Sequence, residues 1–195
     1  MNTDTALWLI FAHDPVGGLM ALVVLGGMLL TLGWALVVFI RDNRSTFFDH
    51  ARAWLVPVLC LIGLGVAAYL TYLETTNAVA VCGPVGDCNT VQHSSYAHLF
   101  GILPVGLLGM AGYTSILAAN AVEHHGQVKW RALAWTGMFG LTLFGVVFSI
   151  YLTWLEIFVI RAMCIWCLSS AVISTLLLLL ATGSSPEAHE LPSAT

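Results

Sequence analysis

Charged side chains are scarce in this chain. Lys and Arg together number 6 and Asp and Glu number 10, so only 8% of the 195 residues are charged, while 59% are hydrophobic. Such a composition cannot surround a single soluble core of this size with polar groups. With a formal net charge of -4, the chain also lacks a basic face for a nucleic acid. We therefore expect a lipid bilayer to solvate much of the protein surface.

Five stretches of the chain lack the polar residues that would interrupt a membrane span. A helix needs about 20 apolar residues to cross a bilayer, and the stretches of suitable length are residues 16–40, 54–76, 99–120, 132–160 and 164–181. None of them shows the alternation of a barrel strand. The sequence therefore predicts an all-α membrane protein with five transmembrane helices.

The head of the chain, residues 1–15, contains no Lys or Arg and so lacks the basic region that opens a secretory signal peptide. We therefore expect the first span to remain in the mature protein. The tail, residues 183–195, has too few apolar residues for a core of its own and is expected to be disordered.

The six basic residues are distributed unevenly between the two sets of loops. Only Arg161 lies in the loops on one side; the other five lie between spans one and two or between spans three and four, and are Arg41, Arg44, Arg52, Lys129 and Arg131. The positive-inside rule then predicts an extracytoplasmic head and a cytoplasmic tail. In a bacterium the protein would lie in the inner membrane with its cysteine loops in the periplasm, where disulfides persist.

An internal repeat relates spans two and four. The segment YLTYLE at residues 69–74 recurs as YLTWLE at residues 151–156, an offset of 82 (151 − 69) that also maps Cys82 onto Cys164. Both helices run outward, so the two cysteine sites are expected at a similar depth. The repeated aromatic and Glu residues are by themselves typical of anchors at the membrane interface.

Four cysteines form two close pairs. Cys164 and Cys167 form a C-x-x-C at the start of the last span, where the helix N-terminus favours the thiolate. Cys164 is expected to be accessible to exchange, and Cys167 to lie one turn deeper. Cys82 and Cys88 bracket a turn-rich loop, which is typical either of a structural disulfide or of a mobile shuttle; the nearby C-x-x-C favours the shuttle.

A zinc site is a further interpretation of four cysteines. The spacing disfavours it, because one pair is C-x5-C and the other opens a membrane helix, whereas closed zinc sites commonly use two C-x-x-C pairs. His93 and His98 could add ligands but are more typical of solvated loop histidines. Cys60 lies in mid-span and is expected to be an inert buried thiol. We predict no metal.

The ordered set of motifs resembles the vitamin K epoxide reductase family over residues 54–180. It comprises the loop pair Cys82 and Cys88, the run CNTVQHS at residues 88–94, the run LFGILP at residues 99–104 and the terminal C-x-x-C. The resemblance implies a four-helix bundle around a quinone, formed by spans two to five, with the first span added outside it. The implied organisation is a head (1–15), an extra helix with a cytoplasmic loop (16–53), a catalytic domain (54–182) and a tail (183–195).

In the family, the C-x-x-C is the redox centre beside the quinone and the loop cysteines relay electrons to it. The resemblance implies that Cys82 exchanges with a reduced partner, Cys88 attacks Cys164, and Cys167 passes electrons to ubiquinone or menaquinone. It further implies that the Ser94 hydroxyl hydrogen-bonds near a quinone carbonyl. Aromatic side chains near the outer helix ends, Phe100 and Trp166, are candidates to stack on the ring, although interfacial aromatics are as often membrane anchors.

The sequence departs from the family pattern in three places. Ala171 stands where the animal enzymes carry a tyrosine, Leu103 is one residue more than the usual Gly-x-Pro before Pro104, and no thioredoxin-like domain is expected after the last span. The expected reductant is therefore a separate thioredoxin-like periplasmic protein. Two alternatives remain: a quinone or quinone-epoxide reductase that recycles quinone, and a non-catalytic membrane subunit with structural disulfides.

Overall fold

The computed structural model describes residues 15–41, 49–76, 78–82, 86–94, 96–99 and 103–183. Most of the predicted head and tail, together with Arg44 and Phe100, lies outside the described residues. Within them, the long helices are α2 (Pro15–Arg41), α3 (Asp49–Thr76), α5 (Val105–His125), α6 (Val128–Leu155) and α7 (Ile165–Ala181). The first four are long and apolar enough to cross a membrane, and α7 is a shorter apolar helix. The predicted all-α membrane fold is confirmed.

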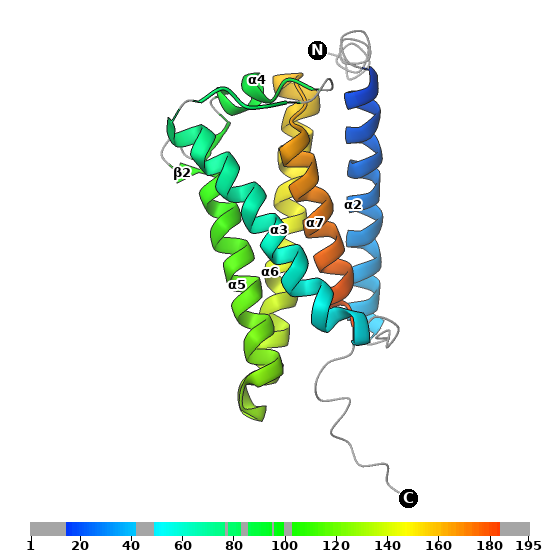
Figure 1. The fold of residues 1–195 in the computed structure, drawn as a ribbon. Helices are drawn as coiled ribbons and strands as arrows, with labels where there is room; N and C mark the ends of the chain where they lie inside the picture. Colours follow the sequence, from blue (N-terminus) through cyan, green and yellow to red (C-terminus); the bar gives the residue numbers. More distant parts are fainter. Residues whose placement is uncertain are drawn as a thin grey trace, which may run out of the picture.

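Four of the helices pack in a ring. Helix α3 contacts α5, α5 contacts α6, α6 contacts α7, and α7 returns to α3, while α2 lies against α6 and α7 from outside (Figure 1). The predicted bundle of spans two to five with an added first helix is therefore correct. Its interior is apolar, and its fully buried side chains include Val56, Met138, Val146, Leu177 and Leu178. Large apolar side chains also cover the outside, as a lipid-facing surface requires; Leu30 and Trp54 are both 78% exposed.

The predicted start of the third span at Leu99 is wrong. Residues His98–Leu99 form β1, which pairs antiparallel with β2 (Leu103–Pro104), and α5 begins only after Pro104. Proline lacks an N–H and disfavours helical backbone in the residue before it, so a helix can follow Pro104 more readily than include it. The apolar run from Leu99 is thus divided between a short hairpin and a helix that continues to His125.

The end of α6 also differs from a regular helix. Residues Glu156–Ile160 form the π-helical segment η2, which ends at Arg161 in the left-handed conformation, with φ of 60°. The hydrogen bonds of a π segment span five residues instead of the four of an α-helix, and such segments are frequent at functional sites. Here η2 brings the chain from α6 to the C-x-x-C that opens α7.

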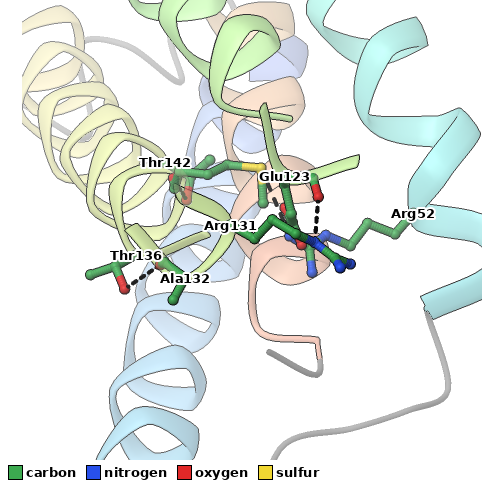
Figure 2. A network of polar contacts seen from close by, with 7 residues as sticks. Arg52, Glu123, Arg131, Ala132, Thr136 and Thr142 are labelled. Atoms are coloured by element: carbon green, nitrogen blue, oxygen red, sulfur yellow. Dashed lines mark hydrogen bonds and ion pairs between the residues drawn. The ribbon is translucent and has the colours of Figure 1, made fainter. Parts of the chain in front are cut away.

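A buried ion pair joins α3 to α5 at the end of the bundle where α3 begins. An Arg52 guanidinium nitrogen lies 2.6 Å from a Glu123 carboxylate oxygen, and the Arg131 Nε–H donates to the Glu123 carbonyl at 3.0 Å (Figure 2). Arg161 lies at the other end, beyond η2. The uneven distribution of basic residues in the sequence thus corresponds to the two ends of the bundle.

Candidate redox site

The two cysteine pairs meet at one end of the bundle. The short helix α4 (Cys88–Gln92) lies across that end and contacts η2 (Figure 1). Cys82 and Cys88 form a disulfide, and Cys164 and Cys167 are free thiols. Cys88 and Cys164 are both fully buried in one cluster, against which Cys82 and Cys167 also pack. The repeat correctly predicts cysteine sites at a similar depth.

Polar side chains around α4 hold the loop that carries the disulfide. The Asp87 carboxylate caps α4 by accepting the Thr90 N–H at 3.1 Å, which is a regular N-cap arrangement. The Asn89 side-chain oxygen accepts the Ala80 N–H at 2.7 Å and so joins α4 to the extended segment before Cys82. These polar contacts join α4 to the residues before Cys82, and Ala80, Cys88 and Val91 are also buried in one apolar cluster.

The loop also docks on the residue that precedes the C-x-x-C. The Asp87 N–H donates to the Met163 carbonyl at 2.9 Å. Gly86, with φ of 88°, passes so close that a Cβ there would lie 2.6 Å from the same carbonyl oxygen. Only glycine suits both this conformation and this close approach.

Trp166, a predicted quinone-stacking residue, makes its contacts with the loop side of the site. Its indole N–H donates to the Val81 carbonyl at 3.2 Å, and its ring lies 4.7 Å from the Tyr69 ring, measured between centroids. The Tyr69 hydroxyl in turn accepts the Val81 N–H at 3.0 Å. Two aromatic side chains thus hold the backbone just before Cys82 against α3 and α7.

The prediction that Cys164 is accessible is wrong, because this residue is fully buried. It caps α7, and its sulfur accepts the Cys167 N–H at 3.4 Å, while the Gln92 amide of α4 lies 3.9 Å away. Helix α4, with Gln92 at its last position, covers Cys164 and separates it from solvent. A hydrogen bond from the Cys167 thiol lowers the pKa of Cys164, aided by the Cys167 and Trp166 N–H groups and opposed by burial. The Cys167 thiol, and to a lesser extent the N–H groups at the start of α7, therefore favour a Cys164 thiolate.

Cys167 lies on the wall of two cavities. The larger cavity has a volume of about 280 Å³ and lies among α3, α5, α6 and α7. The smaller cavity has a volume of about 40 Å³, and beside Cys167 it is lined by Glu74, Gln92, Ser94 and Glu156 among others. Because Cys167 borders both spaces while Cys164 borders the loop, the two thiols of the C-x-x-C face different surroundings.

The larger cavity is mostly apolar with a few polar groups, which suits a ring-shaped ligand with carbonyl oxygens. Trp166 does not belong to its lining. The Tyr113 hydroxyl lies 2.8 Å from Ser170 Oγ within the lining of this cavity. A Cβ on Gly63 would lie 2.5 Å from the Tyr113 ring, so this glycine makes room for the tyrosine. The sequence reasoning missed Tyr113; a lone tyrosine inside an apolar span was the available signal.

A comparison with protein families agrees with this geometry. The model of the vitamin K epoxide reductase family matches residues 54–182, more than half of the chain. The chain belongs to the vitamin K epoxide reductase family. Membership makes it a membrane oxidoreductase of quinone-linked disulfide or epoxide chemistry. The match begins within α3 and ends just after α7, so it covers the four-helix ring and leaves α2 outside.

In this family member, the two repeated glutamates are not exposed interfacial anchors, and that interpretation is wrong for both. Glu74 is 8% exposed and Glu156 is 3% exposed. A Glu74 carboxylate oxygen accepts the Gly106 N–H at 3.1 Å, and a Glu156 carboxylate oxygen accepts the Cys164 N–H at 3.4 Å. An acidic residue at the same place in both halves of an apolar repeat was the signal that could have identified them.

The remaining predicted site residues are placed as follows. The Ser94 hydroxyl donates to the Val91 carbonyl at 2.7 Å and lines the smaller cavity together with Cys167. Cys60 is buried in the apolar core of the bundle, away from the loop cysteines. In the part of the chain that the structure describes, no group of three or more His, Cys, Asp or Glu residues is arranged to hold a metal ion.

Proposed function

We propose that this protein takes electrons from the dithiol of a separate thioredoxin-like periplasmic protein and delivers them to a quinone of the bilayer. The loop pair Cys82/Cys88 receives them and the pair Cys164/Cys167 passes them on, which supports disulfide formation in the partner. One observation carries the proposal. Cys88 and Cys164 share a buried cluster, while Cys167 borders the larger cavity between the helices.

The route consists of thiol–disulfide exchanges followed by one quinone reduction. The partner dithiol reduces the loop disulfide, and the Cys88 thiolate attacks Cys164 in the Cys164–Cys167 disulfide, so that Cys167 leaves. Cys82 then attacks Cys88, which re-forms the loop disulfide and leaves Cys164 and Cys167 as a dithiol. That dithiol gives two electrons and two protons to the quinone. The lowered pKa of Cys164 suits its exchange with the loop.

The larger cavity is the proposed quinone site, for ubiquinone or menaquinone. Its position beside Cys167 and its apolar lining support this assignment. From the family resemblance we also propose that the Ser94 hydroxyl hydrogen-bonds near a quinone carbonyl, for which it must leave the Val91 carbonyl and turn toward the larger cavity, and that Phe100 contacts the ring. The α4 end of the bundle would face the periplasm of a bacterial inner membrane, because Arg52 and Arg131 lie at the opposite end.

Anaerobic mixing of the purified protein with a reduced thioredoxin-like protein and a soluble quinone tests this route by the absorbance of quinol formation. Cys167→Ser is expected to abolish quinol formation, because Cys164 then has no second thiol with which to form the disulfide that the quinone regenerates. Cys60→Ala, a change in the apolar core, is the control and should retain activity. Unchanged quinol formation in Cys167→Ser contradicts the route. Efficient reduction of a quinone epoxide instead of the quinone would favour the recycling alternative.

A further inference from the structure

Two buried carboxyl groups lie beside the redox cysteines, and the electron route above uses neither. Glu74 and Glu156 occupy equivalent positions in the internal repeat, and both line the smaller cavity with Cys167. Their partners differ. The Glu74 carboxylate accepts the N–H of Gly106 at the start of α5, whereas the Glu156 carboxylate is turned toward the C-x-x-C.

Glu156 lies beside both cysteines of the C-x-x-C. One carboxylate oxygen accepts the Cys164 N–H at 3.4 Å, and Glu156 and Cys167 together line the smaller cavity. The side chain is only 3% exposed, so bulk water does not compete for these contacts. The backbone is held as well, because the Glu156 carbonyl accepts the Arg161 N–H at 2.8 Å across η2.

A thiol must lose its proton before its sulfur can react as a nucleophile or join a disulfide. A general base for that proton must lie within hydrogen-bond reach of it, and carboxylates commonly fill this role. We infer that the Glu156 carboxylate accepts the proton of the Cys167 thiol when the quinone oxidises the Cys164/Cys167 pair. This inference rests on the proposed function and assigns to it one further catalytic residue.

The reaction balances as follows. The two S–H bonds break, a bond forms between the Cys164 and Cys167 sulfurs, and two electrons and two protons leave the thiols. The quinone gains two electrons and two protons and becomes the quinol. Glu156 takes the Cys167 proton and releases it into the smaller cavity, whose volume of about 40 Å³ has room for a water molecule. When the loop thiol later attacks the disulfide, Glu156 takes up a proton again from the smaller cavity and gives it to the departing Cys167 sulfur.

Single-turnover quinone reduction by the pre-reduced protein tests the inference without any partner. The protein is reduced with a small thiol, freed of it anaerobically and mixed with a soluble quinone over a range of pH. Glu156→Gln keeps an oxygen for the Cys164 N–H but cannot accept a proton, so we expect a rate at least about 100-fold lower at neutral pH. The deficit should shrink in alkaline solution, where hydroxide can take the thiol proton.

Several titratable groups surround Glu156, so a matched control is needed. They are Cys164 and Cys167 at the start of α7, Glu74 from α3, and Tyr96 from the segment after α4. Glu74→Gln removes a buried acid from the same cavity and keeps the acceptor for the α5 N–H. We expect its rate to stay within about twofold of wild type with an unchanged pH profile.

Glu156→Asp retains an acid with one methylene fewer, and we expect an intermediate rate with the pH profile of the wild type. It carries the test if Glu156→Gln does not fold, and a wild-type rate in Glu156→Asp would then contradict the inference. A wild-type rate and pH profile in Glu156→Gln contradicts it directly. If Cys167→Ser also reduces quinone normally, the electron route itself is wrong; if only Glu156→Gln does so, the route stands without this proton transfer.

Discussion

Replacing Gly106 by alanine should separate two helices that frame the larger cavity. A Cβ at this position would lie 2.6 Å from both the backbone N and the Oγ1 of Thr71, and 3.0 Å from the Ala67 carbonyl oxygen. Thr71 cannot turn away freely, because its hydroxyl donates to that carbonyl at 2.8 Å. Since ordinary contacts begin near 3.4 Å, α3 and α5 must move apart by about 0.8 Å (3.4 − 2.6).

Three contributions set the change in the free energy of unfolding of Gly106→Ala: two destabilise the protein and one stabilises it. Overpacking of this kind costs about 1–3 kcal/mol. The separation also lengthens the 3.1 Å bond from the Gly106 N–H to Glu74, and a buried group that loses its partner costs about 1–3 kcal/mol. Alanine is favoured over glycine in a helix by up to about 1 kcal/mol. We therefore expect a net loss of about 1–5 kcal/mol, which for a protein of this size lowers Tm by about 2 °C or more.

Thermal unfolding in detergent measures this effect, with Gly140→Ala as the control. Gly140 lies within α6, and a Cβ there would meet nothing within 4 Å. This variant has the same gain in helix propensity without the clash, so its Tm should equal or exceed that of the wild type. A Gly106→Ala protein that is as stable as Gly140→Ala would refute the argument from close approach.

Two further changes test contacts at opposite ends of the bundle. Glu123→Gln removes a carboxylate that lies 2.6 Å from the buried Arg52 guanidinium and should cost about 1.5–3 kcal/mol in thermal unfolding, whereas replacing both residues by leucine should restore much of the stability. Equal Tm values for Glu123→Gln and wild type would show that the ion pair contributes nothing. Asn89→Ala removes the acceptor of the Ala80 N–H, worth about 1 kcal/mol, and should make a small thiol reduce the loop disulfide about fivefold faster. An unchanged reduction rate would mean that this bond does not restrain the loop.

Local patterns in the sequence were enough to predict the long helices and the two cysteine pairs. Uninterrupted apolar runs predict the spans, because a segment inside lipid must form all its backbone hydrogen bonds internally and therefore becomes a helix. The offset of 82 correctly predicts that the two cysteine sites lie at a similar depth. The start of the third span was misplaced, because an apolar run does not distinguish a hairpin from a helix. Pro104 was the residue that marked the boundary.

Hydrophobicity and spacing, which are properties of neighbours along the chain, thus determined that this is a helical membrane protein with two close cysteine pairs. Only the tertiary structure decided that Cys164 is covered by α4, that Cys167 borders two cavities, and that Glu156 faces the cysteines instead of the membrane interface. The physical reason is that burial and hydrogen bonding at this site arise between residues tens of positions apart. Gln92 and Cys164, for example, are separated by 72 residues.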